Sequence, residues 1–460
     1  MIEIMDKVME KLSKKAKYSE VRYMSSESVQ ASMRNSEFMG EGSSSGEGIA
    51  IRALNNSISM GFISSFDMEK LDVIIDRVLK NSMKTGRNKL DTSGGIRDKW
   101  EATGKHRVED LQSSDRIEIM KGADELMKSH ELSVRVNYIH HKNIREIFEN
   151  SSGSLIESAY SRIGYFMVGG YKDANSFEQI YRQFGTTGGM ESFDELEVEQ
   201  KIRDTVGNLK VISSSPAAKP GKYDVVISPE IAGIVAHESC GHPTEWDRIT
   251  GREGSLAGES FLTGKKYPFK VGSEVVNVID DPTVKGSYGY YRYDNEGVKA
   301  RKRYLYKGGM TNEFIHSRES AANLGVEPNG GGRASDWDME PLARMSTTYI
   351  EPGDFSFEEL IEDVKNGVYI RTYTEWNIDD IRFNEKYVGS EAYLIENGKI
   401  TGRLRKPTIE TNTINFYSSI DAVSNELEFS AGTCGKGDPE QGVDTWMGGP
   451  SVRLRNIYIS

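Results

Sequence analysis

Residues 223–244 read YDVVISPEIAGIVAHESCGHPT and decide how the carboxy-terminal half of the chain folds. The run from Tyr223 to Ile227 is short, apolar and typical of a β-strand. Ser228 suits the N-cap of a helix and Pro229 its first position, because the serine oxygen accepts an unpaired backbone N–H and proline lacks one. The apolar face of that helix would consist of Ile231, Ile234 and Val235. We therefore expect a strand followed at once by a buried helix.

The end of this helix carries two imidazoles and a carboxylate, in the hexapeptide His237-Glu238-Ser239-Cys240-Gly241-His242. Imidazole nitrogens bind zinc-like ions, and a neighbouring glutamate can act as a general base toward metal-activated water. Residues five apart are separated by about 140° around a regular α-helix, too far to hold one ion. The helix must therefore widen as a π-bulge does, or unwind before His242. The flanking Gly241 and Pro243 favour such an ending.

A third ligand must come from elsewhere in the chain. The two cysteines are Cys240 and Cys434, and Cys434 lies in the glycine-rich segment 430–437, SAGTCGKG, for which we expect a loop. Glu245 and Asp247 are the local oxygen alternatives. With Cys434 as third ligand, the ion keeps an open position for water, as catalytic sites do. A closed structural zinc is the alternative, held by His237, Cys240, His242 and Cys434.

Several further segments, together with the histidine motif, resemble one known family. They are residues 18–22 (YSEVR), 48–52 (GIAIR), 237–245 (HESCGHPTE), 278–283 (VIDDPT), 293–298 (YDNEGV), 344–348 (RMSTT), 351–354 (EPGD) and 432–436 (GTCGK). The chain resembles the TldD/PmbA family, and specifically its TldD-type metalloprotease subunit. The resemblance covers nearly the whole chain and is most specific in the carboxy-terminal half.

The resemblance implies a metallopeptidase of the HExxxH type. In that reading His237, His242 and Cys434 bind one divalent metal ion, zinc, and Glu238 is the catalytic carboxylate. It also implies unfolded or flexible polypeptides as substrate, and a dimer with a second copy or with a metal-free companion subunit of the family. Two other functions stay open: a binding or assembly protein with the closed zinc site, and a hydrolase of a different amide.

Composition restricts which classes of protein the chain can belong to. Hydrophobic residues make up 37% and charged residues 28% of the 460 positions, and no apolar run approaches the ~20 residues that a membrane span needs. A net charge of −12 argues against a nucleic-acid partner, which normally requires a basic surface. The amino terminus lacks the pattern of a signal peptide, and two cysteines near one candidate site fit a reducing cytoplasm.

The chain divides into three regions by its pattern. We expect an amino-terminal region of helices and strands over 1–91, a central helix and several strands over 106–212, and a metallopeptidase domain over 222–460. The small, proline-containing segment 213–221 is the strongest boundary. The predicted class is a multidomain α+β protein of mixed helices and mostly antiparallel sheets, with a carboxy-terminal metal-binding domain. Adjacent His140 and His141 would point to opposite faces of a strand, and we assign them no function.

Overall fold

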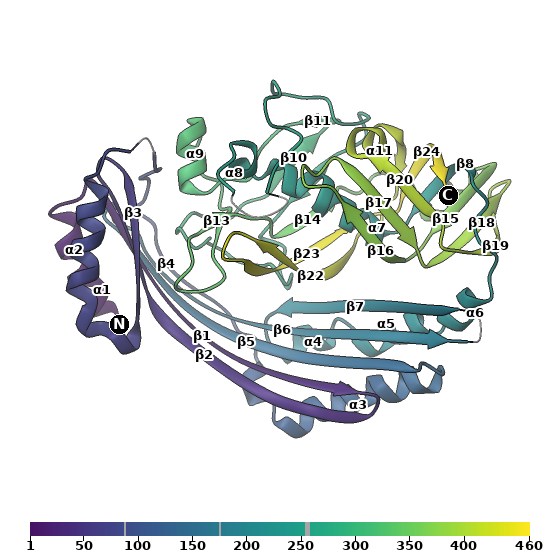
Figure 1. Cartoon of the computed structure of the whole chain (residues 1–460), viewed down its shortest axis with the longest axis horizontal. Coiled ribbons are helices and arrows are strands. Elements are labelled where there is room, and N and C mark those ends of the chain that lie inside the picture. Colours follow the sequence, from purple (N-terminus) through teal and green to yellow (C-terminus); the bar gives the residue numbers. More distant parts are fainter. Residues whose placement is uncertain (87–88, 174–175, 254–257) are drawn as a thin grey trace.

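The computed structural model describes residues 1–86, 89–173, 176–253 and 258–460. In Figure 1 a long, curved sheet formed by the amino-terminal half cradles a carboxy-terminal half that is built from further sheets and short helices. Within the described residues, no helix combines the length and the apolar character required to cross a bilayer. The predicted α+β class with mostly antiparallel sheets is confirmed.

The amino-terminal sheet has the strand order β3-β2-β1-β5-β6-β4, with β7 paired to β6. All pairs are antiparallel except β4 with β6. The strands are β1 (Tyr18–Arg34), β2 (Glu37–Leu54), β3 (Ile58–Ser64), β4 (Arg97–Ala102), β5 (Val134–Asn150), β6 (Leu155–Lys172) and β7 (Phe177–Thr187). Strands from both predicted regions, 1–91 and 106–212, thus form one sheet.

Six α-helices accompany this sheet. They are α1 (Ile2–Ser13), α2 (Leu71–Ser82), α3 (Ser113–Ser129), α4 (Met190–Asp194), α5 (Val198–Val206) and α6 (Leu209–Ser213), with 3₁₀ turns at Ser65–Lys70 and Val108–Asp110. One apolar cluster joins α1 and α2 to one end of the sheet, and a second joins α3, α5 and α6 to the other end. In Figure 1, α3 lies on the face turned away from the carboxy-terminal half, so the opposite face is free to meet that half.

The carboxy-terminal half contains two large sheets. A six-stranded sheet has the order β11-β10-β9-β14-β23-β22, and a nine-stranded sheet the order β16-β17-β20-β24-β8-β15-β18-β19, with β21 paired to β24. The strands are β8 (Gly221–Ile227), β9 (Val278–Asp280), β10 (Arg303–Lys307), β11 (Met310–Thr311), β14 (Thr347–Ile350), β15 (Asn366–Ile370), β16 (Tyr373–Ile378), β17 (Asn384–Gly389), β18 (Glu391–Glu396), β19 (Lys399–Arg405), β20 (Thr408–Asn412), β21 (Ile420–Val423), β22 (Glu428–Lys436), β23 (Gln441–Gly449) and β24 (Val452–Ile459). A small ladder joins β12 (Gly332–Arg333) and β13 (Leu342–Ala343).

Helix α7 (Pro229–Val235) follows β8 directly and is buried between these two sheets. Its apolar residues share one core with β8 and β15 of the nine-stranded sheet and with β9, β14 and β23 of the six-stranded sheet. Two of the candidate metal ligands, His237 and His242, lie in the turns that directly follow α7. The remaining helices are α8 (Trp246–Ile249), α9 (Arg318–Leu324), α10 (Phe357–Glu362) and α11 (Thr413–Ser419).

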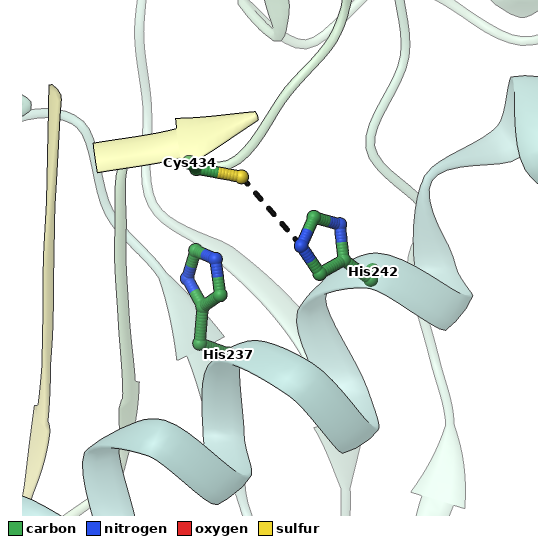
Figure 2. Close-up of side chains that lie close together, drawn as sticks. All are labelled: His237, His242 and Cys434. Carbon is green, nitrogen blue, oxygen red and sulfur yellow. Dashed lines mark hydrogen bonds between the residues drawn. The ribbon is translucent and has the colours of Figure 1, made fainter. Parts of the chain in front are cut away.

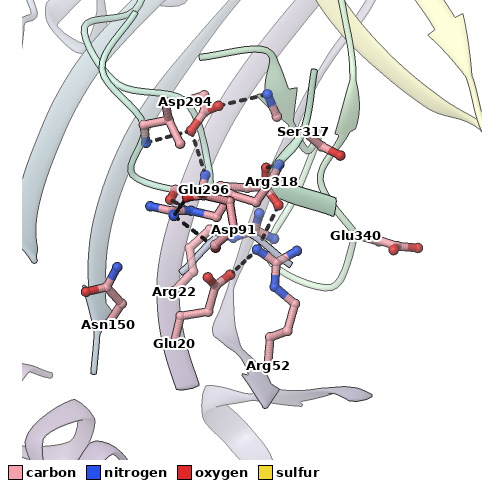
Figure 3. A network of polar contacts seen from close by, with 12 residues as sticks. Glu20, Arg22, Arg52, Asp91, Asn150, Asp294, Glu296, Ser317, Arg318 and Glu340 are labelled. Carbon is pink, nitrogen blue, oxygen red and sulfur yellow. Dashed lines mark hydrogen bonds and ion pairs between the residues drawn. The ribbon is translucent and has the colours of Figure 1, made fainter. Parts of the chain in front are cut away.

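Buried ion pairs connect the two halves. Arg52 of β2 contacts Glu20 of β1 at 2.5 Å and Glu296 of the carboxy-terminal half at 2.7 Å, and its side chain is only 3% exposed. Arg318 at the start of α9 donates to the backbone oxygen of Glu296 at 2.8 Å and to Asp91 at 2.9 Å. Figure 3 shows these side chains meeting from both halves. The curved sheet is therefore held to the rest of the molecule by desolvated charges.

Candidate metal centre

The helix that carries the histidine motif begins as its sequence predicts. Ser228 is the N-cap, with its hydroxyl oxygen accepting the backbone N–H of Ile231 at 3.5 Å, and Pro229 is the first helical residue. A π-helical turn, Ala236–Gly241, then continues the helix, followed by a 3₁₀ turn, His242–Thr244. The expected widening of the helix between the two histidines is confirmed.

The wider turn brings both imidazoles to one side. The ring centroids of His237 and His242 lie 4.9 Å apart. His242 Nε2 is 3.5 Å from the sulfur of Cys434, and one ligand atom from each of the three residues lies within 4.8 Å of the others. Figure 2 shows two side chains converging from the helical turn and the third from β22. Two imidazoles and one thiolate are a donor set that suits zinc, so the residues fit such an ion.

A strand carries Cys434, so the prediction of a loop over 430–437 is wrong for most of that segment. Cys434 lies in β22, opposite Val443 of β23. The glycines of this strand allow close packing instead of a tight turn: a Cβ on Gly432 would lie 2.5 Å from Met447. The buried guanidinium of Arg344 donates to the backbone oxygen of Cys434 and fixes the strand at this point.

Glu245 orients a histidine rather than joining the ligand group. Its Oε2 lies 3.1 Å from His242 Nδ1, which leaves Nε2 to face Cys434. Arg248 donates to the same oxygen at 2.7 Å, and Lys436 approaches it at 3.2 Å. Burial alone would raise the pKa of Glu245, but Lys436, His242 and Arg248 outweigh burial and hold that pKa well below its usual value. A carboxylate that fixes the ring of a ligand histidine is a common outer partner in metal sites.

Burial and neighbouring charges favour the ligand forms of the three side chains. Burial lowers the pKa of His237 and of His242, which disfavours the charged imidazolium forms. Burial would raise the pKa of the Cys434 thiol, but His242 and Arg344 lower it to about 7 in total. His237 Nδ1 is buried and, among the described residues, has no hydrogen-bond partner.

Glu238 directly follows His237, and its carboxylate forms an ion pair with an arginine. Arg382 Nη1 contacts Glu238 Oε2 at 2.5 Å. Arg382 belongs to the turn between β16 and β17, almost 150 residues further along the chain. No motif in the sequence singles it out, so the sequence analysis missed it.

A cavity of about 410 Å³ opens onto this group of residues. Its wall contains His237, Glu238, His242, Arg382 and Cys434, together with aromatic side chains of β7 and β16 and the outer strand β22. A second cavity, of about 650 Å³, shares part of this wall and continues along β22. The candidate centre is therefore reached through a groove between the edge strands β7 and β22.

The remaining candidate residues lie apart from this centre. Cys240 is fully buried in the apolar core, where burial raises its thiol pKa well above the usual value, and it is absent from the ligand group found in the described residues. Asp247 contacts Lys436 at 2.7 Å. His140 and His141 lie in β5 as expected, and His140 Nε2 bonds the hydroxyl of Tyr288 at 2.6 Å.

Two domain models of one protein family match the chain. Residues 220–460 match the PmbA/TldA metallopeptidase C-terminal domain, and residues 19–82 match domain 1 of the same family. A protein of Methanothermobacter thermautotrophicus named metalloprotease is 32% identical over 451 residues, covering 97% of this chain and 96% of its own. A zinc metalloprotease TldD homolog of Saccharolobus solfataricus is 30% identical over 273 residues, 58% of each chain.

A solved structure shares the whole fold. TldE from Thermococcus kodakarensis superposes with a TM-score of 0.73 at 19% identity and covers 99% of both chains. The matches to the family models place the chain in a class of metallopeptidases. Within that class, the chain belongs to the TldD/PmbA family, as the carboxy-terminal domain match and the full-length relative show. The resemblance inferred from its motifs is thereby confirmed.

Proposed function

We propose that this chain is a zinc metalloprotease of the HExxxH type that cleaves peptide bonds in unfolded or flexible polypeptides. One observation carries the proposal: a buried His237, His242 and Cys434 cluster beside Glu238, on the wall of an accessible cavity. These three side chains would hold the ion. When bound, zinc supplies Lewis-acid chemistry for the scissile carbonyl and an activated water.

Glu238 is the general base and acid of the proposed reaction. Its carboxylate lines the same cavity as the ligand atoms and can take one proton from the attacking water. The same proton then passes to the nitrogen of the leaving amine as the C–N bond breaks. Glu238→Gln should lower kcat about 100-fold or more with unchanged zinc content, because general acid–base catalysis contributes at least this much. Retained activity in that variant would refute the mechanism.

Counting sulfur ligands distinguishes the open site from a closed structural zinc. X-ray absorption at the zinc edge should find one sulfur with nitrogen and oxygen neighbours. Two sulfurs would mean that Cys240 completes the shell, and in that case Cys240→Ala would unfold the protein while Glu238→Ala left its activity intact. The position of Cys240 in the apolar core, outside the ligand group, favours one sulfur.

The shape of the groove supports an extended substrate. β22 is the outer strand of its sheet and lines the cavity, and Gln183 of β7 contacts Thr433 of β22 at 3.1 Å. A peptide backbone would pair with the part of this edge that faces the cavity. A folded protein cannot offer such a strand without opening. A globular protein that has been irreversibly unfolded should therefore be cleaved, whereas the same chain in its stably folded form should not. Equal cleavage of folded and unfolded forms would argue against this selectivity, and a preference for short non-peptide amides would indicate a different amide hydrolase.

We further propose that the chain works in a reducing cytoplasm as a dimer, with itself or with a metal-free companion subunit. Both cysteines are free, and the proposed ligand requires a reduced Cys434. Light scattering of the purified chain, alone and mixed with a companion subunit of the family, measures the assembly. A monomer of full activity in both samples would refute the dimer.

A further inference from the structure

The proposed reaction creates negative charge on the oxygen of the scissile carbonyl, and Arg382 is placed to meet it. Besides Arg382, the cavity wall contains one other arginine, Arg182, whose guanidinium is 3.1 Å from Glu230 and also bonds a backbone oxygen at 2.7 Å. Among the described residues, Glu238 is the one ion-pair partner of Arg382, at 2.5 Å. The Nε of Arg382 is enclosed and makes no hydrogen bond within that part of the chain. The guanidinium therefore lies on the cavity wall beside the general base, with a single carboxylate as its counter-charge.

The chain holds Arg382 in a fixed position. Its backbone adopts a left-handed conformation, with φ of +62°, which is costly for a residue with a side chain. Asp379 stabilises the turn by accepting the backbone N–H of Arg382 at 2.9 Å and that of Phe383 at 2.7 Å. Thr413 donates its hydroxyl to the Arg382 backbone oxygen at 3.1 Å. Strain of this kind, fixed by several bonds, is typical of functional positions.

We infer that Arg382 is a catalytic residue that donates an N–H to the carbonyl oxygen of the scissile peptide bond as that oxygen becomes negative. This inference rests on the proposed function. The water oxygen bonds to the carbonyl carbon, the C=O π pair moves onto oxygen, and Glu238 takes the released proton. Arg382 pairs with the new charge and leaves Glu238 free to deliver its proton to the amine. A fixed cation in a buried site stabilises such charge more than water does.

The kinetic test separates this role from simple substrate binding. Arg382→Ala should lower kcat about 100- to 1,000-fold and change KM less than about threefold, as the loss of one oxyanion donor does. Ethylguanidinium in solution should restore part of kcat, and Arg382→Lys should keep part of it. Lys386→Ala, a control that removes an exposed positive charge from β17, should leave both constants unchanged.

A binding measurement gives a readout that does not depend on turnover. A phosphinic peptide, built on the best peptide that the wild type cleaves, presents a tetrahedral anion at the scissile position. In a Glu238→Gln background, Arg382→Ala should weaken the phosphinic peptide about 100-fold and the uncleaved peptide itself only slightly, because catalytic interactions form in the transition state.

The other possible outcomes each contradict either the inference about Arg382 or the proposed function. If wild-type protein cleaves peptides and Arg382→Ala raises KM at constant kcat, Arg382 is a substrate-binding residue and the inference fails. If Arg382→Ala loses zinc or unfolds, Arg382→Met decides, because methionine keeps the bulk but removes the charge and the donors: a folded, zinc-loaded methionine variant with wild-type affinity for the phosphinic peptide also refutes the inference. If zinc-loaded wild type cleaves no peptide, the proposed function fails instead.

Discussion

At the residue scale, a second buried acid, Glu385, accepts a hydrogen bond from the π-turn Ala236–Gly241. Ser239, between His237 and His242, donates its hydroxyl to Glu385, and the Tyr387 hydroxyl donates to the same carboxylate at 3.1 Å. Burial raises the pKa of Glu385 to about 7, although both hydrogen bonds favour the charged form. The position thus prefers a neutral acid that still accepts these two donors.

This preference predicts a pH dependence of stability. The folded-state pKa of Glu385 is about 7 and its ordinary value is 4.5, so between these values the folded protein binds more protons than the unfolded chain. The contribution of Glu385 to the free energy of unfolding is fully present below pH 4.5 and is lost as the pH rises to about 7. Glu385→Gln stays neutral, and should stabilise the protein at pH 8 by up to roughly 3 kcal/mol, the equivalent of 2.5 pKa units.

Thermal unfolding at several pH values measures this effect. The unfolding midpoint of Glu385→Gln should exceed that of the wild type at pH 8, and the two should converge at pH 5. Zinc content should be equal, since Glu385 touches no ligand. A constant difference between the two proteins at all pH values would show that Glu385 does not titrate in this range.

At the element scale, the sequence predicts the helix better than the strand that faces it. The strand–helix junction at Ser228 follows from local capping rules, and the π-turn follows from the five-residue spacing of His237 and His242. β22 was missed because its glycines read as a loop, and only the packed structure shows Met447 against Gly432. Arg382 could not be predicted, since its role depends on a contact across 144 residues.

One glycine of the π-turn gives a test of this packing. A Cβ on Gly241 would lie 1.7 Å from the sulfur of Met345, which is itself fully buried. The backbone of Gly241 has φ of −58°, which alanine also adopts, so the cost of Gly241→Ala comes from crowding alone. We expect a loss of about 1–3 kcal/mol, typical of an overpacked core, together with weaker zinc binding.

A compensating variant makes this prediction specific. Removing the crowded side chain in Gly241→Ala/Met345→Ala should give a smaller loss than the sum of the two single variants, because residues in contact are not additive. Gly122→Ala in α3, where a Cβ meets no atom within 4 Å, is the matched control and should not destabilise. Strictly additive losses in thermal unfolding would mean that Met345 does not limit the turn.

At the scale of the whole molecule, the charges around Arg52 fix the curved sheet against the carboxy-terminal half. Burial would lower the pKa of Arg52, but Glu20 and Glu296 raise it, so the guanidinium remains charged between two buried carboxylates. Arg318, whose Nε also bonds the Glu296 backbone, ties the same point to Asp91. None of these side chains belongs to the group of His237, His242 and Cys434, so we expect the cluster to contribute to the contact between the two halves.

Arg52→Met should therefore destabilise the contact between the two halves while sparing the metal centre. It leaves Glu20 and Glu296 buried without their cation, which costs about 3–5 kcal/mol. Hydrogen exchange should rise in β1 and β2 but remain slow in β8 and α7, and bound zinc should stay unchanged. Glu20→Gln/Arg52→Met/Glu296→Gln should recover most of the loss, because it also removes the two charges left without a partner.

Arg107→Met is the matched control: it breaks an exposed pair with Glu101 and should cost no more than about 1 kcal/mol. Equal losses for Arg52→Met and Arg107→Met would show that the buried cluster does not hold the halves together.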